Sequence, residues 1–187
     1  MRQTRQSTPF AILALLTLKP MSGYELKKMM QSSIAHFWTE SYGQIYPALQ
    51  KLAKDGLALR KTEKTAGKPD KQVYRVTAKG RSALRRWLAE EPRSQPPRSE
   101  LLLKLFFFSE MPSLDAARHN VEAARERSRA ELAAYSKIED QLRSNRKDHP
   151  GLPFWLMTLN FGRKRSQAVA EWADETLHGL EAIAHAR

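Results

Sequence analysis

The 187-residue sequence offers few side chains at the spacing of a catalytic or metal site. It contains no cysteine, which excludes disulfides, thiolate nucleophiles and Cys-ligated metals. The histidines are scattered, without metal-binding spacing: His36, His119, His149, His178 and His185. Glu139 and Asp140 are neighbours on an expected helix, so their carboxylates point apart. We therefore expect no enzyme, no cofactor and no metal site.

Hydrogen-bonding side chains gather instead in the segment around residue 46. Glutamine can bond adenine bidentately, and a tyrosine hydroxyl can reach a phosphate or a base. On a helix that enters the major groove of DNA, we expect this set to contact the double helix: Tyr42, Gln44, Tyr46 and Gln50. The alternative for the two tyrosines is that they pack between helices.

Basic residues continue from this segment along the chain. The net charge is +12, and residues 1–92 carry 17 Lys and Arg against 7 Asp and Glu, a net +10, whereas residues 93–187 carry only +2. Such an asymmetry favours a polyanionic partner for the first half. Seven basic residues are candidates for phosphate neutralisation, each with a solvated charge as its alternative: Lys51, Lys54, Lys61, Lys64, Lys68, Lys71 and Arg75.

Three helices are expected to position these side chains. Thr8 followed by Pro9 predicts the start of a first helix, which ends before Pro20. Ser22 predicts the cap of a second helix. The third helix ends at Gly56 and has an apolar row at core-facing spacing: Ile45, Ala48, Leu49 and Leu52.

A hairpin and a fourth helix complete this half. Leu57, Leu59 and Lys61 alternate with Ala58 and Arg60 as in a half-buried strand, and residues 73–76 form the partner strand. Thr77 predicts the cap of the next helix. This element order is that of a winged helix. We expect a mainly α fold with a small β-hairpin, in which an N-terminal winged helix-turn-helix precedes a C-terminal α-helical dimerisation domain.

Prolines mark the boundary between the two domains. Pro92, Pro96 and Pro97 bar regular helix and sheet bonding, which predicts a stiff linker. We expect a winged-helix DNA-binding domain in residues 1–92 and an α-helical dimerisation domain in residues 93–187. Arg2 and Arg5 precede an apolar run as in a signal peptide, but Lys19 and Pro20 follow at once. No transmembrane span is expected, and the cytoplasm is the expected location.

The second half is expected to form helices whose apolar surfaces are buried against another chain. Residues 101–108 are apolar on nearly all sides, which favours a helix covered by a second copy; a buried strand is the alternative. A helix of about thirty residues follows Ser113, with imperfect heptads, and another follows Pro153. The expected dimerisation residues are Leu102, Leu105, Phe106, Phe107, Val121, Tyr135, Ile138, Leu142, Phe161 and Trp172.

Several short motifs together resemble those of a known family. They are Gly23-Tyr24-Glu25-Leu26, Ile45-Tyr46-Pro47-Ala48-Leu49, Asp55-Gly56-Leu57 and Tyr74-Arg75-Val76-Thr77, with a looser match at Lys104-Leu105-Phe106-Phe107 and Leu159-Asn160-Phe161-Gly162. The sequence resembles PadR-like transcriptional regulators with a virulence-activator-type C-terminal domain. The resemblance implies a homodimer that binds a palindromic operator in double-stranded DNA, usually as a repressor, and is often released by a small-molecule effector.

Two other functions remain open from the residues alone. A nonspecific nucleic-acid-binding protein would bind all sequences alike, with the same steep salt dependence. A basic helical adaptor would bind a protein partner through residues 101–108 and leave DNA unread. An effector cavity lined by aromatic residues is a further expectation, with these candidates: Trp38, Trp87, Phe154 and Trp155.

Overall fold

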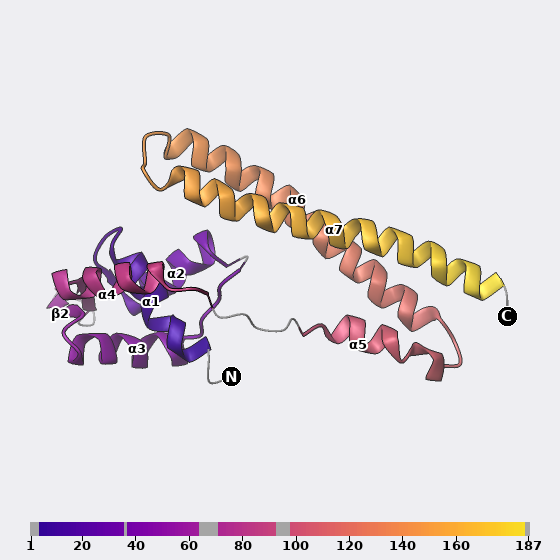
Figure 1. Cartoon of the computed structure of the whole chain (residues 1–187), viewed down its shortest axis with the longest axis horizontal. Helices are drawn as coiled ribbons and strands as arrows, with labels where there is room; N and C mark the ends of the chain where they lie inside the picture. The colour runs from indigo at the N-terminus through magenta and orange to yellow at the C-terminus, as the bar shows by residue number, and fades with distance from the viewer. Residues whose placement is uncertain (1–3, 36, 64–70, 93–97, 186–187) are drawn as a thin grey trace. The chain divides into compact units, whose positions relative to one another are not determined.

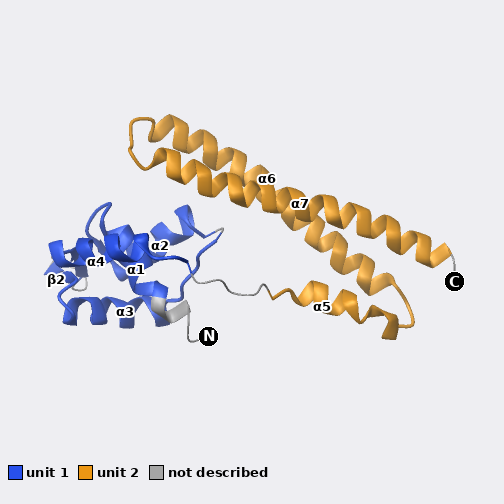
Figure 2. Cartoon of the chain, viewed as in Figure 1, with its two compact units in different colours: residues 1–94 blue, residues 95–187 orange. Residues whose placement is uncertain are grey.

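The computed structural model describes residues 4–35, 37–63, 71–92 and 98–185. The chain forms two compact units, residues 1–94 and residues 95–187 (Figure 2). Most of the predicted proline linker, residues 93–97, lies outside the described residues. In the described part of the chain, no helix combines the length and the apolar character that a membrane span requires.

Unit 1 is a winged helix (Figure 1). Its elements are α1 (Thr4–Leu16), β1 (Met21–Ser22), α2 (Gly23–Ser33), α3 (Tyr42–Lys54), β2 (Ala58–Glu63), β3 (Lys71–Val76) and α4 (Ala78–Ala89). The strands form an antiparallel sheet in the order β1-β3-β2. The predicted fold class is confirmed, and the structure adds β1, a two-residue strand that the sequence did not reveal.

Local side-chain bonds fix where the helices of unit 1 begin. Ser22 and Glu25 form a capping box at the start of α2, and the Thr77 hydroxyl accepts a hydrogen bond from the amide of Gly80 in α4. After α3, Gly56 adopts φ +69°, the left-handed conformation that glycine favours. These three predicted boundaries are confirmed.

The predicted start of the first helix is wrong. Helix α1 begins at Thr4, so Thr8 and Pro9 lie inside it. Thr8 is buried, and its hydroxyl donates to the carboxylate of Glu40, 32 residues away, at 2.5 Å. A tertiary contact therefore uses the side chain that the sequence assigned to a cap.

The core of unit 1 lies between its helices and the sheet. Ile45, Leu49 and Leu52 project from α3 and are fully buried, as the apolar row predicted. They meet buried side chains of α1 and α2, including Leu13 and Leu26. This packing holds α3 by one face, so that its other face lies outward.

Unit 2 consists of helices. Its elements are α5 (Glu100–Phe106), the 3-10 turn η1 (Phe108–Glu110), α6 (Asp115–Asn145) and α7 (Leu152–His185). Residues 101–106 are helical, so the strand alternative is wrong for this segment. The expected helix of about thirty residues is α6, and it forms a long antiparallel hairpin with α7 (Figure 1).

Small and polar side chains, as well as apolar ones, hold α6 and α7 together. Small residues on the buried side of α7 include Gly162, Ser166 and Ala173. The Ser166 hydroxyl donates to Glu131 at 2.6 Å, and Arg125 donates to Asp174 at 3.1 Å. These bonds between the helices set their register, because each needs its two partners side by side.

Candidate nucleic-acid interface

Helix α3 presents a polar face to solvent. Tyr42, Tyr46, Gln50 and Lys54 are all exposed, opposite the buried row that begins at Ile45. The four lie at helical spacing, so they form one face. As the second helix of the α2–α3 pair, α3 has the place of a recognition helix in a helix-turn-helix.

The two tyrosines pack against each other, and Tyr46 also packs against α2. Their rings stack with centroids 6.0 Å apart, and a Cβ added to Gly23 would lie 2.6 Å from Tyr46 Cε1. The Tyr46 ring therefore lies directly on the first turn of α2, while 46% of the residue stays exposed. Packing between helices and contact with a ligand are thus compatible for Tyr46.

Gln44 has a different local role from the one that its type suggested. Its Oε1 accepts hydrogen bonds from the backbone amide and the hydroxyl of Ser41, both at 2.9 Å. An amide N–H can only donate, so the atom facing it must be the carbonyl oxygen of Gln44. Bidentate pairing with adenine needs that same oxygen, and would require the bonds at the start of α3 to break.

The basic side chains of α3 differ in their surroundings. Lys51 forms an ion pair with Asp55 at 2.9 Å. Lys54 is exposed, and no ion pair joins it to the other described residues. Gln50 is exposed on the same face. Lys54 is therefore freer than Lys51 to approach a phosphate.

The hairpin carries three of the predicted basic residues on one face. Lys61 lies opposite Val73, Leu59 opposite Arg75, and Glu63 opposite Lys71 in the β2–β3 register. Directly paired residues project to the same face of a sheet, so Lys61, Lys71 and Arg75 share it. Lys64 and Lys68, also predicted to bind phosphate, lie outside the described residues.

Lys71 is already engaged by a carboxylate. Its ammonium lies 2.8 Å from Glu25 Oε1, which links β3 to the first turn of α2. The Lys71 ammonium and the Ser22 amide lower the pKa of Glu25 to about 2, so this carboxylate is charged at neutral pH. Of the three wing residues, Lys71 has the weakest case for a phosphate contact.

The structure adds three exposed residues that the predicted set lacks. Tyr24 and Lys28 lie one turn apart on α2, the helix that crosses the DNA backbone in a helix-turn-helix. Arg60 lies on the hairpin face opposite to Lys61. Helical spacing could have indicated the first two, but the face of Arg60 depends on the strand register.

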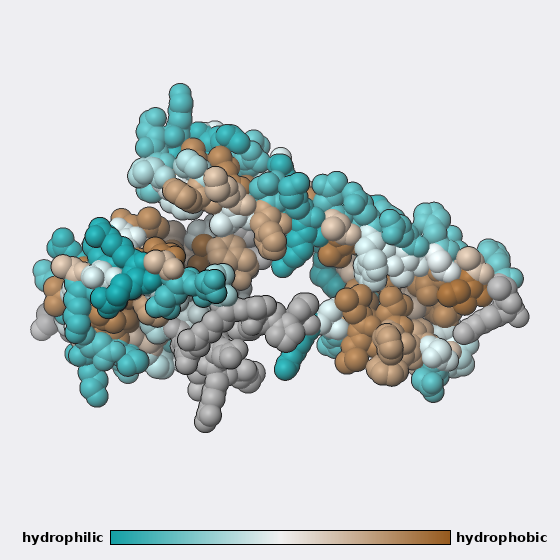
Figure 3. Space-filling view, in the orientation of Figure 1, coloured by the Kyte–Doolittle hydropathy of each residue, from teal (hydrophilic) through white to brown (hydrophobic). Residues whose placement is uncertain are grey.

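The predicted dimerisation residues divide into exposed and buried groups. Val121 is buried against α7, and Tyr135 of α6 is buried as well, so their burial needs no second chain. Leu105, Ile138, Leu142 and Trp172 are half-buried. Four others are exposed, Phe106 by 81%: Leu102, Phe106, Phe107 and Phe161. Figure 3 shows hydrophobic side chains gathered over α5.

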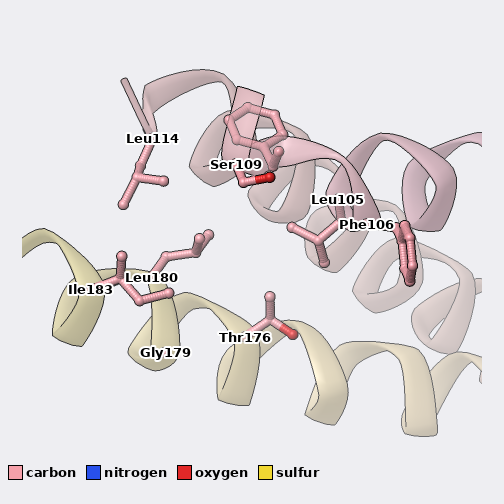
Figure 4. A pocket seen from close by; sticks show the side chains of 9 residues that line it. Leu105, Phe106, Ser109, Leu114, Thr176, Gly179, Leu180 and Ile183 are labelled. Carbon is pink, nitrogen blue, oxygen red and sulfur yellow. The ribbon is translucent and has the colours of Figure 1, made fainter. Parts of the chain in front are cut away.

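A groove of about 470 Å³ lies between the α5–η1 segment and the C-terminal part of α7. Leu105 and Leu114 face Leu180 and Ile183 across it (Figure 4), and Phe108 also lines it. The groove is thus mostly apolar, with Ser109 and Thr176 as its polar side chains. Of the aromatic residues expected in an effector cavity, Trp87 stacks on Phe10 in unit 1, and Trp155 stacks on His149 in unit 2. The effector cavity stays a prediction.

No cluster of His, Asp and Glu among the described residues could hold a metal ion. The exposed residues of α3 and of the wing supply hydrogen-bond donors and positive charge. These residues can therefore bind an anionic surface.

Comparisons with known proteins agree with this arrangement. The transcriptional regulator PadR-like family model matches residues 12–86, and the virulence activator alpha C-terminal model matches residues 97–181. The virulence activator AphA of Vibrio cholerae is 30% identical, with a TM-score of 0.72 over 95% of this chain and 99% of that one. The chain belongs to the PadR-like family of transcriptional regulators.

Other transcriptional regulators resemble it over different lengths. The structure of Bacillus subtilis PadR in complex with operator DNA has a TM-score of 0.78 and 25% identity, over 92% of this chain and 98% of that one. The probable transcriptional regulator Rv1176c of Mycobacterium tuberculosis is 40% identical over 82 residues, 44% of this chain and 43% of that protein. The matched region spans about half the length of the curated relatives.

Proposed function

We propose that this PadR-like protein is a DNA-binding transcriptional regulator that binds a palindromic operator as a homodimer, most simply as a repressor. The observation that carries the proposal is the outward face of α3, where Tyr42, Tyr46, Gln50 and Lys54 lie together, on a helix held by its buried face. The PadR structure with operator DNA supports it, because the same fold is there in complex with its operator. The proposal needs no reaction and no cofactor, and it places the protein in the cytoplasm.

Sequence-specific and nonspecific contacts are assigned to different elements. On α3, Tyr42, Tyr46 and Gln50 are proposed to approach base edges in the major groove. The basic residues predicted on α3 and the wing are proposed to neutralise phosphates: Lys51, Lys54, Lys61, Lys64, Lys68, Lys71 and Arg75. Lys71 is proposed to contribute least, because it is paired with Glu25. Gln44 is proposed to act first as a brace for the start of α3.

The homodimer is proposed to form through unit 2. Leu102 and Phe106 of α5, Phe107 directly after it, and Phe161 of α7 are large apolar residues exposed to solvent. A patch of this kind is unusual on a monomer and typical of an interaction surface. Pairing of two copies would present two α3 helices to half-sites about one helical turn apart, or a multiple of that distance.

The test is binding of the full chain to DNA from the region upstream of its own gene, beside unrelated DNA of equal length, across a salt series. We expect a marked preference for the upstream fragment and a fall in affinity for both with salt. Equal, salt-sensitive binding to both fragments would favour the nonspecific binder. No binding at low salt would favour the adaptor.

A further inference from the structure

We propose that Glu40 is a positioning residue for DNA recognition, which holds the start of α3 in the orientation that reads an operator. The inference rests on the proposed function and concerns a residue that makes no proposed contact with DNA. Glu40 lies directly before Ser41, the residue that precedes the first turn of α3. It is only 3% exposed, which is unusual for a carboxylate.

Two side chains hold one oxygen of this carboxylate. The Thr8 hydroxyl of α1 donates to Glu40 Oε1 at 2.5 Å, and the Trp38 indole N–H donates to the same oxygen at 3.1 Å. Thr8 belongs to a helix with buried neighbours at Ile12 and Leu13. The carboxylate therefore ties the chain just before α3 to a fixed part of the core.

The backbone of Glu40 is held as well. Its carbonyl oxygen accepts a hydrogen bond from the Lys27 ammonium of α2. Contacts from α1, from α2 and from the preceding loop thus converge on a single residue. The next residue, Ser41, donates hydrogen bonds from its amide and its hydroxyl to Gln44. These bonds extend the constraint on the backbone into the first turn of α3.

The second carboxylate oxygen argues for a role beyond stability. Oε2 is buried, and no described residue donates a hydrogen bond to it. A buried polar atom without a hydrogen-bond partner destabilises the fold, so a side chain that served stability alone would leave no such atom here. The directional hydrogen bonds from Thr8 and Trp38 instead fix the orientation of the chain before α3. A recognition surface depends on such a fixed orientation.

The variants Glu40→Ala and Glu40→Gln test this role, with Glu91→Gln as a control that removes a charge from an exposed position of the same unit. The measurements are affinity for the upstream fragment, affinity for unrelated DNA and the salt slope of each. We expect Glu40→Ala to lower the ratio of the two affinities about tenfold, with little change in the affinity for unrelated DNA or in the slope. Glu40→Gln keeps an oxygen acceptor for Thr8 and Trp38, so most of the ratio should return.

Amide hydrogen exchange in the free protein gives a second readout that does not depend on DNA. We expect Glu40→Ala to speed exchange about tenfold at residues 41–46 and to leave the amides of α4 unchanged. If Glu40→Ala does not fold, Thr8→Val removes the same hydrogen bond from the other side and is measured in its place.

The outcomes separate this inference from the proposed function. A wild-type chain that does not prefer the upstream fragment would overturn the proposed function. Unchanged exchange at residues 41–46 would overturn the role of Glu40 whatever the DNA result. A variant that only melts at a lower temperature, with the affinity ratio intact, would reduce Glu40 to a stabilising residue.

Discussion

At the scale of single residues, Gly23 determines where the Tyr46 ring lies. A Cβ at this position would come within 2.6 Å of the ring, so the ring must move in Gly23→Ala. We expect about a tenfold loss of operator preference, because a displaced Tyr46 also disturbs its stack with Tyr42. Fragment-binding titrations measure the loss. In a Tyr46→Ala background the glycine substitution should cost nothing more, and additive losses would contradict this account.

The ion pair between Glu25 and Lys71 leads to a second prediction at this scale. Lys61→Ala should flatten the salt slope of DNA binding by about one, whereas Lys71→Ala should change it little. Glu25→Gln should steepen the slope and raise affinity for every sequence, because it frees Lys71 and the amide can still serve the capping box. Salt titrations with unrelated DNA provide the measurement. Equal slopes for Lys61→Ala and Lys71→Ala would show that the pair opens on binding.

Residues whose partners are near in sequence were predictable, and those with distant partners were not. Ser22 and Thr77 cap helices through bonds to residues three positions away, which the sequence displays. Thr8 bonds to Glu40, far along the chain, and local rules therefore assigned it wrongly to a cap. Gln44 has the residue type of a base reader, yet its carbonyl braces Ser41. Residue type alone does not distinguish these uses.

At the scale of elements, the alternation of residue types could not predict which face of the short strand β2 is buried. The pattern placed Leu57 and Leu59 on the buried side of the first strand. In the structure Ala58 is buried and Leu59 is 64% exposed, since the side that faces the core follows from pairing with β3. The long helices carried a stronger signal, because their apolar rows extend over many turns. In unit 2, however, small and charged residues also contribute to the contact between the two long helices, and a search for apolar heptads does not find them.

Charged pairs across the α6–α7 hairpin predict how unit 2 responds to acid. Arg125 lowers the pKa of Asp174 across the hairpin. Arg143, four residues along α6, and Arg163 of α7 lower the pKa of Glu139. A carboxylate whose pKa is lowered in the folded state stabilises the fold above its unfolded pKa, about 4, and this stabilisation is lost as the pH falls through the lowered value. Urea unfolding should show Asp174→Asn less stable than wild type at pH 7. The difference should shrink as the pH falls below about 4 and vanish once the pH is below the lowered pKa of Asp174. A difference that stays constant with pH would contradict the assignment.

At the scale of the whole molecule, the division of charge agrees with the division into units. The excess of positive charge lies in the first half of the sequence, and the large exposed apolar residues of α5 lie in the second. Composition therefore indicated which half meets an anion. It did not indicate which apolar residues of unit 2 are covered within the chain. Val121 and Phe106 are both apolar residues of expected helices, yet the first is buried and the second is exposed.

Association of two chains is the prediction that belongs to this scale. Phe107→Asp should yield a monomer with native helix content, because the side chain is exposed within one chain but would bring an unpaired charge into an interface. Light scattering and far-UV circular dichroism provide the two measurements, and operator affinity should fall at least tenfold. Phe107→Leu serves as the control. A Phe107→Asp protein that stays dimeric would move the interface elsewhere on unit 2.

The exposed aromatic surface of α5 has a consequence for how sharply a gene would respond. When two copies are joined, docking of one unit 1 on its half-site leaves the other at an effective concentration on the order of millimolar. Avidity then makes occupancy depend on the dimer, whose amount rises with the square of the monomer concentration while monomers predominate. A small change in expression would give a large change in promoter occupancy, so these phenylalanines would set a threshold for the regulatory circuit.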